Sequence, residues 1–338
     1  MKIVFFHRKG GKDAVSIEVS FEPFIARLAE SNEVKVYRVP YDGSNPIYLL
    51  KNILFIHRHS IKDGINHITG DIHYGILGLM GRPSVLTIHD DYAIRMAHRG
   101  WWDKVYKWIF WIFLPIKIAD ASVCITPTTL KRIRRYYNSS KLLSITHHSV
   151  SGDFSDKHKP FNEKSPVILQ VGTAPHKNLE STLKALKGIP CKLVILKTMT
   201  EVQKRMAEAL GITYENKTNL SYEEVIETYD KSDMVVFPSS FEGLGLPILE
   251  AQASGKPVIT TDREPMNWVA GDGVILLKDP LDIPKYRAAV LQLIQNKGMR
   301  KELRAKGLKN VKRFSLDNAV HQYMDLYTKI LKKEKLEV

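Results

Sequence analysis

Short apolar runs rich in β-branched residues alternate with longer segments of helical period along this 338-residue chain. The segments between the runs predict helices, although Pro23 is expected to kink or interrupt the one over residues 14–31. This alternation is typical of βαβ units, so we predict an α/β fold with parallel sheets. The predicted strands are 2–6, 33–39, 52–58, 84–90, 121–127, 141–150, 166–172, 191–197, 233–239, 256–262 and 274–278.

Residues 151–165 are polar and show no period, which indicates a linker, and the alternating pattern restarts after them. We therefore predict two Rossmann-like, doubly wound domains, over residues 1–152 and 165–316. The basic helical tail, 317–338, is expected to return to the first domain. Sheets of this kind bind ligands beyond the carboxyl ends of their strands, and two of them would face each other across a cleft.

Charge and composition limit the classes of binding partner that suit this chain. The formal net charge is +14, and residues 1–150 carry 21 Lys and Arg against 12 Asp and Glu. This excess suits an anionic partner: a nucleic acid, a nucleotide diphosphate or an acidic membrane face. Cys124 and Cys191 each lie in an apolar run, as buried side chains do. With no targeting signal and no window of about 18 uncharged apolar residues, we expect a cytoplasmic protein.

The segment "FEGLGLPILEAQASGKPVITTD" (241–262) combines two glutamates with a glycine-rich loop. A helix is predicted over 247–254, because Pro247 suits its first position and Gly255 the position after its end. Gly243 and Gly245 let backbone amides approach a ligand, and the positive end of the helix points at the same loop. This geometry predicts a phosphate site.

Glu242 and Glu250 flank that phosphate site. Carboxylates only accept hydrogen bonds, so they suit hydroxyl groups better than phosphate. A diphosphate with a polyol on either side, such as a nucleotide sugar, fits the pattern. The alternative is a capped, solvated helix start with no ligand.

The sequence resembles the retaining glycosyltransferases of family 4, also called group 1, which have the two-domain GT-B fold. The likeness is carried by "FPSSFEGLGLPILEAQASGKPVITTD" with its Glu-x7-Glu pair, and by "LQVGTAPHKNLESTLKAL" and "SYEEVIETYDKSDMVVFPS". It covers most of residues 165–280. In the first half it is thinner and rests on "FFHRKGG", "HITGDIHY" and "LTIHD".

The resemblance implies roles for the donor-binding residues. Glu250 would hold the ribose hydroxyls, and Glu242 would hold the transferred sugar and the β-phosphate. The amides of Gly243, Leu244 and Gly245 would assist Glu242. Lys177 would bind the diphosphate. Thr173 follows Gly172 where family members often have an arginine, so one phosphate clamp is replaced by a neutral side chain.

In the first domain, the turn at Gly10 and Gly11 resembles the loop that admits phosphate and acceptor. His89 matches a histidine that faces the reacting sugar, although a hydrogen-bonded histidine at a strand end is an equal alternative. Asp71 and His73 fit a structural or cleft-lining role better.

The implied reaction is transfer of a sugar from a nucleotide sugar to a glycan or lipid-linked acceptor, with retention at the anomeric carbon. The leaving diphosphate would take the acceptor's proton, so catalysis would rest on positioning and electrostatics. No Asp-x-Asp element follows a strand, so we expect no metal. We also expect no cofactor, because the nucleotide sugar is a substrate. Nothing in the sequence selects a UDP, GDP or ADP donor.

Three other interpretations stay open. The tryptophan-rich segment 99–120 fits peripheral contact with an anionic membrane, or simply a helix packed on the first sheet. The same fold could serve a nucleotide-sugar epimerase or a phosphorylase. A basic nucleic-acid-binding protein fits less well, because the basic residues are spread along helices without a recognition motif, so no nucleic acid is expected.

Overall fold

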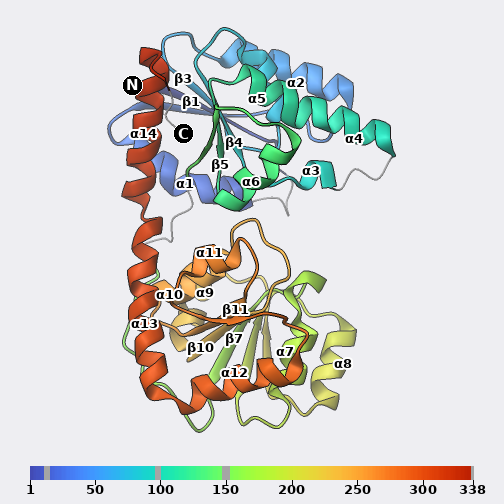
Figure 1. The fold of residues 1–338 in the computed structure, drawn as a ribbon, viewed down its shortest axis with the longest axis vertical. Helices are drawn as coiled ribbons and strands as arrows, with labels where there is room; N and C mark the ends of the chain where they lie inside the picture. The colour runs from blue at the N-terminus through green and yellow to red at the C-terminus, as the bar shows by residue number, and fades with distance from the viewer. Residues whose placement is uncertain (11–15, 96–99, 147–152, 336–338) are drawn as a thin grey trace. The chain divides into compact units, whose positions relative to one another are not determined.

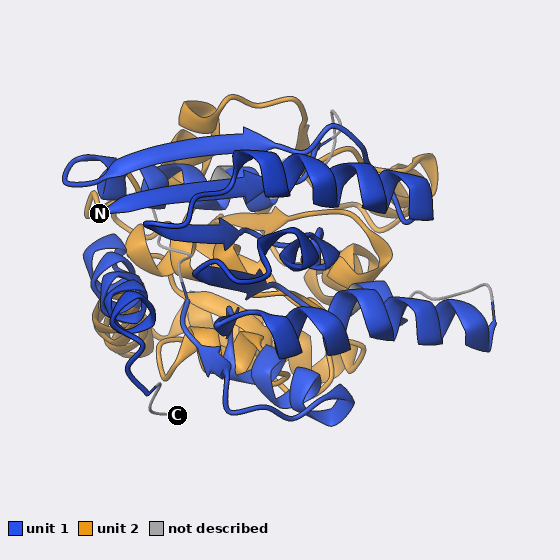
Figure 2. Ribbon diagram, turned by 90° about the horizontal axis from the view of Figure 1, so that it is seen from above, with its two compact units in different colours: residues 1–149, 314–338 blue, residues 150–313 orange. Residues whose placement is uncertain are grey.

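The computed structural model describes residues 1–338 except 11–15, 96–99, 147–152 and 336–338. The chain forms two compact units (Figure 2). Unit 1 comprises Met1–Ser149 and Phe314–Val338, and unit 2 comprises Val150–Arg313. Each unit contains one parallel sheet with helices on its faces (Figure 1).

The sheet of unit 1 has six parallel strands in the order β2-β1-β3-β4-β5-β6. The order reverses between β1 and β3, which makes that edge the switch point where such sheets bind ligands. The elements are β1 (Lys2–His7), α1 (Ser16–Ala29), β2 (Glu33–Arg38), α2 (Pro46–His59), β3 (Ile65–Ile68), the 3-10 helix η1 (His73–Leu79), β4 (Ser84–Ile88), α3 (Tyr92–Arg95), α4 (Trp101–Lys107), the π-helix η2 (Trp108–Phe113), α5 (Leu114–Ile118), β5 (Ala121–Cys124), α6 (Pro127–Tyr136), β6 (Leu142–Ser144) and α14 (Leu316–Lys332).

Both faces of this sheet are covered, and the alternation along β1 shows it. Val4 and Phe6 belong to one core, with residues of α2 and α5, whereas Ile3 and Phe5 belong to another. That second core also includes Tyr323 and Tyr327 of α14, the last helix of the chain. Figure 1 shows α14 in red beside the blue first strands.

Unit 2 repeats the design with the order β12-β11-β10-β7-β8-β9. Its switch point lies between β7 and β10, because chain order reverses there. The elements are β7 (Val167–Val171), the 3-10 helix η3 (Pro175–Lys177), α7 (Leu179–Leu186), β8 (Lys192–Leu196), α8 (Glu201–Ala209), β9 (Tyr214–Lys217), α9 (Tyr222–Lys231), β10 (Met234–Phe237), α10 (Leu246–Ala253), β11 (Val258–Thr261), α11 (Met266–Ala270), β12 (Ile275–Leu277), α12 (Ile283–Gln295), α13 (Lys297–Val311) and the 3-10 helix η4 (Lys312–Phe314).

The predicted fold class, two doubly wound parallel sheets, is confirmed, but one predicted strand is wrong. Residues 52–58 lie in α2, whose buried residues Leu49, Asn52 and Ile56 recur every three or four positions, as on one helix face. The apolar run looked strand-like because the exposed face of this helix is also apolar. Pro23 lies inside α1 without ending it, and Cys124 and Cys191 are free and buried.

Candidate functional site

The junction between β10 and α10 forms the centre of the candidate site in unit 2. Glu242 and Gly243 lie in the loop, and Gly245 caps the helix with a φ of 104°, a conformation that favours glycine. Pro247 lies in the first turn of α10, as its second residue and not as its first, which was the predicted position. Leu244 is buried, which anchors the loop on the unit's core. The positive end of α10 therefore points into the loop that carries Glu242.

Lys177, at the end of η3, reaches across the switch point to this loop. Its Nζ forms an ion pair with Glu242 Oε1 and lies 4.5 Å from the centre of the Phe237 ring. The stem of Lys177 runs over Gly172, whose φ is 96°. A Cβ at Gly172 would lie 3.0–3.2 Å from three carbons of the lysine, so this glycine makes room for it.

Buried hydrogen bonds hold the backbone of this lysine in place. Gln170 is buried, and its Nε2 donates to the Lys177 carbonyl over 3.0 Å. Thr182 Oγ1 in turn donates to Gln170 Oε1 over 2.6 Å. Asn178 Nδ2 donates to Pro238 O and Ser240 Oγ, both at 2.7 Å, which ties the lysine's turn to the loop after β10. The side chain of Lys177 is thus presented from a fixed support.

Glu250 lies on α10 and takes a different partner from Glu242. The hydroxyl of the buried Tyr229, on α9, donates to Glu250 Oε2 over 2.6 Å. Burial raises the pKa of Glu250, and the hydrogen bond from Tyr229 partly offsets that rise. The tyrosine therefore favours the ionised carboxylate, the form that accepts hydrogen bonds from hydroxyls.

Thr173 follows Gly172 but does not present its hydroxyl as a free donor. Thr173 Oγ1 donates to Thr198 O over 2.7 Å, and the Thr173 carbonyl accepts from Gln203 Nε2 at 2.9 Å. Cationic charge at this edge is supplied by Lys177 instead. Burial, and next the charge of Lys177, lower the pKa of the adjacent His176, which favours its neutral form.

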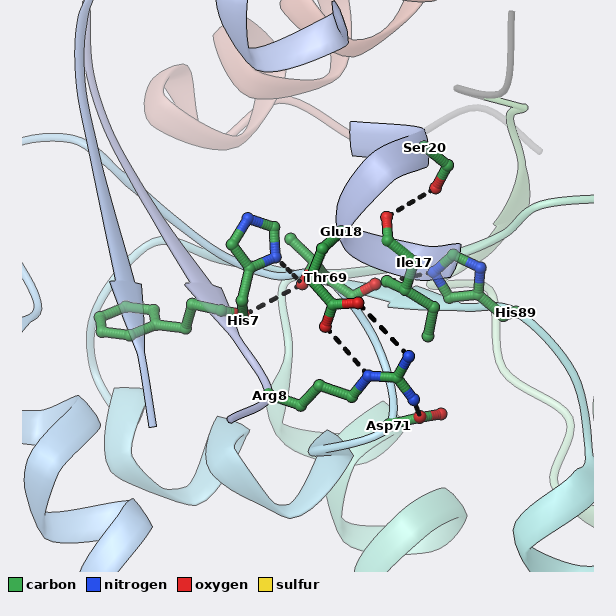
Figure 3. Close-up of polar contacts among 9 residues, drawn as sticks. His7, Arg8, Ile17, Glu18, Ser20, Thr69, Asp71 and His89 are labelled. Atoms are coloured by element: carbon green, nitrogen blue, oxygen red, sulfur yellow. Dashed lines mark hydrogen bonds and ion pairs between the residues drawn. The ribbon is translucent and has the colours of Figure 1, made fainter. Parts of the chain in front are cut away.

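A second polar cluster lies at the switch point of unit 1 (Figure 3). Arg8, the first residue after β1, donates from Nε to Glu18 Oε1 over 3.0 Å and from Nη2 to Glu18 Oε2 over 3.4 Å. Arg8 also pairs through Nη1 with Asp71, after β3. The Glu18 side chain is 2% exposed and that of Asp71 is 48% exposed. Arg8 therefore joins a buried carboxylate to one that faces solvent.

His89 lies beside this cluster. Its Nε2 is 2.8 Å from the Thr69 carbonyl, and because a carbonyl only accepts, Nε2 carries the proton. Burial lowers the pKa of His89, so the ring is neutral at pH 7. A Cβ at Gly70 would lie 2.6 Å from the His89 ring, so this glycine allows the ring to sit against the loop.

The other candidate residues that the sequence indicated in unit 1 are Gly10, Gly11, His73 and Asp71, and they differ in their surroundings. Gly10 has a φ of 70°, as a turn glycine does, whereas Gly11 lies outside the described residues. His73 is buried, and its Nδ1 lies 2.7 Å from the Trp111 carbonyl, which gives it a structural role. Asp71 lines a pocket of about 370 Å³ together with Arg8, Gly10, Asp42, Lys107 and Trp111.

Three residues of the two clusters escaped the sequence analysis: Arg8, Glu18 and Tyr229. Arg8 had a usable signal, because it directly follows the first strand and so stands at the carboxyl edge of the sheet. Glu18 and Tyr229 had none, since each reaches its partner from a separate helix.

No three His, Cys, Asp or Glu side chains of the described residues gather as a metal site requires. None of the helices in the described ranges has the length and apolar character of a membrane span.

Residues 152–310 match the family model of glycosyl transferases group 1. The O-antigen chain mannosyltransferase RfbU of Salmonella typhimurium is 28% identical over 247 residues, which cover 70% of this chain and 67% of that protein. The O-antigen chain mannosyltransferase B of Escherichia coli is 36% identical over 105 residues, 31% of this chain and 27% of the relative. The chain thus spans about a quarter of that relative's length.

Solved structures show the same fold. A glycosyltransferase from Rickettsia africae superimposes with a TM-score of 0.75 at 15% identity, covering 98% of this chain and 99% of that one. WaaG, a glycosyltransferase involved in lipopolysaccharide biosynthesis, gives 0.69 at 13% identity, covering 97% and 100%. These findings show that unit 2 matches the group 1 glycosyltransferases and that the chain has the GT-B fold.

Proposed function

We propose that this protein is a retaining, metal-independent transferase that moves a sugar from a nucleotide-diphosphate sugar to a glycan or lipid-linked acceptor. The pair of Lys177 and Glu242 at the positive end of α10 carries the proposal. It sets a cation, a helix N-terminus and a carboxylate around one point, as a diphosphate next to a polyol requires. The related mannosyltransferases of O-antigen chains favour surface polysaccharide synthesis and make mannose the first sugar to test.

The residues of unit 2 would divide the work of donor binding. Lys177 and the amides of Gly243, Leu244 and Gly245 would neutralise the diphosphate, and Glu250, whose ionised form the hydrogen bond from Tyr229 favours, would accept from the ribose hydroxyls. Glu242 would accept from the sugar hydroxyls. No protein residue would remove the acceptor's proton.

In the transfer step, the bond between the anomeric carbon and the phosphate oxygen breaks while the acceptor oxygen bonds to the same face. The acceptor's proton passes to the leaving phosphate oxygen, which then departs as nucleoside diphosphate. The charge that develops on this oxygen is what Lys177 and the end of α10 would stabilise.

A thermal-shift screen against UDP-, GDP- and ADP-sugars tests the donor site. Sugars of one of these nucleotides should raise the melting temperature of the wild-type protein, and the Lys177→Gln variant should show no such rise. Release of the nucleoside diphosphate should require an acceptor, which separates transfer from epimerisation. If no nucleotide sugar shifts the melting temperature, the proposal is wrong.

We also propose that unit 1 contacts an anionic membrane through α2 and α4. On α2, the side chains of Ile47, Leu50 and Leu54 are 47–61% exposed although they share one helix face. On α4, Trp101 and Trp102 are 60% and 68% exposed and stack on each other at 3.7 Å. Exposed apolar patches of this kind mark interaction sites.

The charges on α2 and α4 favour an anionic surface as the partner of these helices. Helix α2 has no acidic residue but carries Lys51 and Arg58, and α4 exposes Lys104. An apolar face with a basic border is typical of helices that lie in an anionic lipid surface. The Tyr106 hydroxyl of α4 donates to Ser44 O, just before α2, over 3.0 Å, so the two elements meet at this point. Asp42, Ser44 and Lys107 also line the pocket that contains Arg8, so an acceptor held in a membrane would find this pocket nearby.

Sedimentation with vesicles tests the membrane contact. Wild type should pellet with phosphatidylglycerol vesicles more than with phosphatidylcholine vesicles, and added salt should weaken the binding. Leu50→Gln/Leu54→Gln and Trp101→Ser/Trp102→Ser should each reduce pelleting. Val202→Gln/Leu281→Gln, which changes equally exposed residues of unit 2, is the control. Equal losses in the test and control variants would contradict the proposal.

A further inference from the structure

One pocket of unit 2 lies at the amino ends of the strands, the opposite edge of the sheet from Lys177 and Glu242. Its volume is about 460 Å³, within the range of small-molecule sites. Its walls come from the segment before β7, the residues before β10, the turn between α10 and β11, and the first turns of α13. Lys177 and Glu242 lie at the carboxyl ends of these strands, so this pocket is separate from the site that contains them.

The lining of this pocket is strongly cationic. Six basic side chains face three carboxylates, Asp156, Glu163 and Asp233, and each carboxylate already forms an ion pair with one of the basic side chains. Asp233, which is buried, accepts from the backbone N–H of Val167 over 2.7 Å as well as from Lys159 over 2.8 Å. Glu163 pairs with the buried Arg300. The basic residues are Lys159, Lys256, Lys297, Arg300, Lys301 and Arg304.

Two buried side chains of the pocket lack a partner among the described residues: Lys256 has no carboxylate to form an ion pair with, and the Ser254 hydroxyl has no hydrogen-bond partner. Lys256 is 7% exposed, and its Nζ donates to the Asp230 carbonyl over 2.9 Å, while no carboxylate of the described residues lies within ion-pair distance. Ser254 is 1% exposed, and its hydroxyl has no hydrogen-bond partner among the described residues. A buried cation and a buried hydroxyl in this state are costly unless a ligand satisfies them.

Helix α13 begins at the same pocket with an unfavourable charge distribution. Lys297, Arg300 and Lys301 stand in its first five residues, and its first turn has no acidic residue. Cations at the positive end of a helix repel its dipole, so a bound anion would relieve this repulsion. Lys297 and Lys301 are exposed and form no ion pair with another described residue.

We propose that this pocket is a second anion site, which takes a small phosphate-bearing anion with two or more charges. Lys256 and Ser254 contact it from the floor, and Lys297 and Lys301 from the rim. The site does not depend on the donor role of the opposite edge. Helix α10 joins the two, since its first turn meets the donor loop and Ser254 ends it.

Inorganic pyrophosphate is the probe, titrated calorimetrically into the full-length protein at about 0.15 M salt. Lys297→Gln/Lys301→Gln should bind it at least tenfold more weakly than wild type. Ser254→Ala, which leaves the net charge unchanged, should also weaken binding. Lys309→Gln/Lys312→Gln removes the same charge from the other end of α13 and should bind within twofold of wild type.

The donor site could also bind pyrophosphate, so Lys177→Gln is titrated in parallel. This variant should keep the binding that Lys297→Gln/Lys301→Gln loses. The proposal is overturned if Lys177→Gln abolishes all binding, if the two double variants weaken equally, or if Lys297→Gln/Lys301→Gln binds like wild type.

The phosphate group could belong to a soluble compound or to a lipid headgroup. Saturable binding of pyrophosphate assigns a soluble ligand. Phosphatidylglycerol vesicles that bind wild type but not Lys297→Gln/Lys301→Gln, without pyrophosphate binding, assign a headgroup. If neither probe distinguishes this variant from wild type, the pocket is not an anion site.

Discussion

The two units place the same kinds of side chain at the same topological position but hold them differently. In unit 2, Lys177 after β7 pairs with Glu242 after β10, and in unit 1, Arg8 after β1 pairs with Asp71 after β3. Each pair therefore bridges a switch point. Arg8 also donates two hydrogen bonds to the buried Glu18, which clamp its guanidinium, whereas the Nζ of Lys177 lies over an aromatic ring.

This difference means that the charged group of Lys177 can move, whereas that of Arg8 is fixed. A lysine is a flexible point charge that can leave Glu242 for a phosphate. The planar guanidinium of Arg8 is fixed by its two hydrogen bonds to Glu18, and it keeps Asp71 and the nearby loop in position. We therefore expect substitutions in unit 2 to affect mainly turnover and substitutions in unit 1 to affect mainly stability.

The largest expected effect is on turnover in Glu242→Ala. This change removes a hydrogen-bond acceptor for the sugar and frees Lys177, so kcat should fall by about 10²–10³, as when one stabilising group of an active site is lost. Steady-state release of nucleoside diphosphate measures it. Glu302→Ala, which removes the exposed partner of Lys306, should keep wild-type turnover. Normal turnover in Glu242→Ala would remove this residue from the site.

A slightly smaller effect is expected on the stability of unit 1 in Arg8→Met. The Glu18 carboxylate would stay buried without its cation, which costs about 3 kcal/mol. Urea unfolding measures the loss. Arg8→Met/Glu18→Met should recover much of it, and Arg27→Met, which breaks only exposed ion pairs, should change little. An equal loss in Arg8→Met and Arg27→Met would contradict the clamp.

The same comparison explains what the sequence could predict. Glu242, Gly245 and Glu250 lie within one short segment, so the turn, the cap and the helix end are local features that sequence reveals. The ion pair between Lys177 and Glu242 was not predicted, because it depends on the strand order that places β7 beside β10, and the family resemblance gave only the diphosphate-binding role of Lys177. Arg8, Glu18 and Asp71 come from three segments that meet only after the sheet forms, so no local pattern connects them. The predicted strand over 52–58 failed for another reason: the exposed face of α2 is apolar, which hid the helical period.

Acid should weaken unit 1 before unit 2. Burial lowers the pKa of His7 to about 4 and that of His67 to about 3, against 6.5 for an unfolded histidine. Below pH 6.5 the unfolded chain therefore takes up protons that the folded unit refuses. Stability is full above 6.5 and falls as the pH drops towards 4, by roughly 2 kcal/mol per histidine at about pH 5.

Hydrogen exchange measured by mass spectrometry at about pH 7 and pH 5, corrected for intrinsic rates, tests this difference. Amides of β1 and β3 should lose protection more than those of β7 and β10. In unit 2, the lowered pKa of His176 acts in the same direction, but burial raises the pKa of Glu250, and a raised carboxyl pKa makes stability fall as the pH rises, the opposite sign. His67→Gln should reduce the pH effect, whereas His158→Gln, an exposed residue of unit 2, should not. Equal loss in both units would be evidence against the buried histidines as the cause.

The smallest effect is expected from Gly172→Ala, and it tests whether the mobility of Lys177 depends on the space beneath it. Alanine at a φ of 96° costs about 1–2 kcal/mol, and its Cβ would also press on the lysine stem. Gly211→Ala is the matched control, because Gly211 has a φ of 66° but no atom within 4 Å of the new Cβ. Both variants should therefore lose similar stability in urea unfolding, while only Gly172→Ala should raise the donor KM, by about tenfold, equivalent to about 1.4 kcal/mol. A KM that rises equally in both would mean that backbone strain, and not the position of Lys177, controls donor binding.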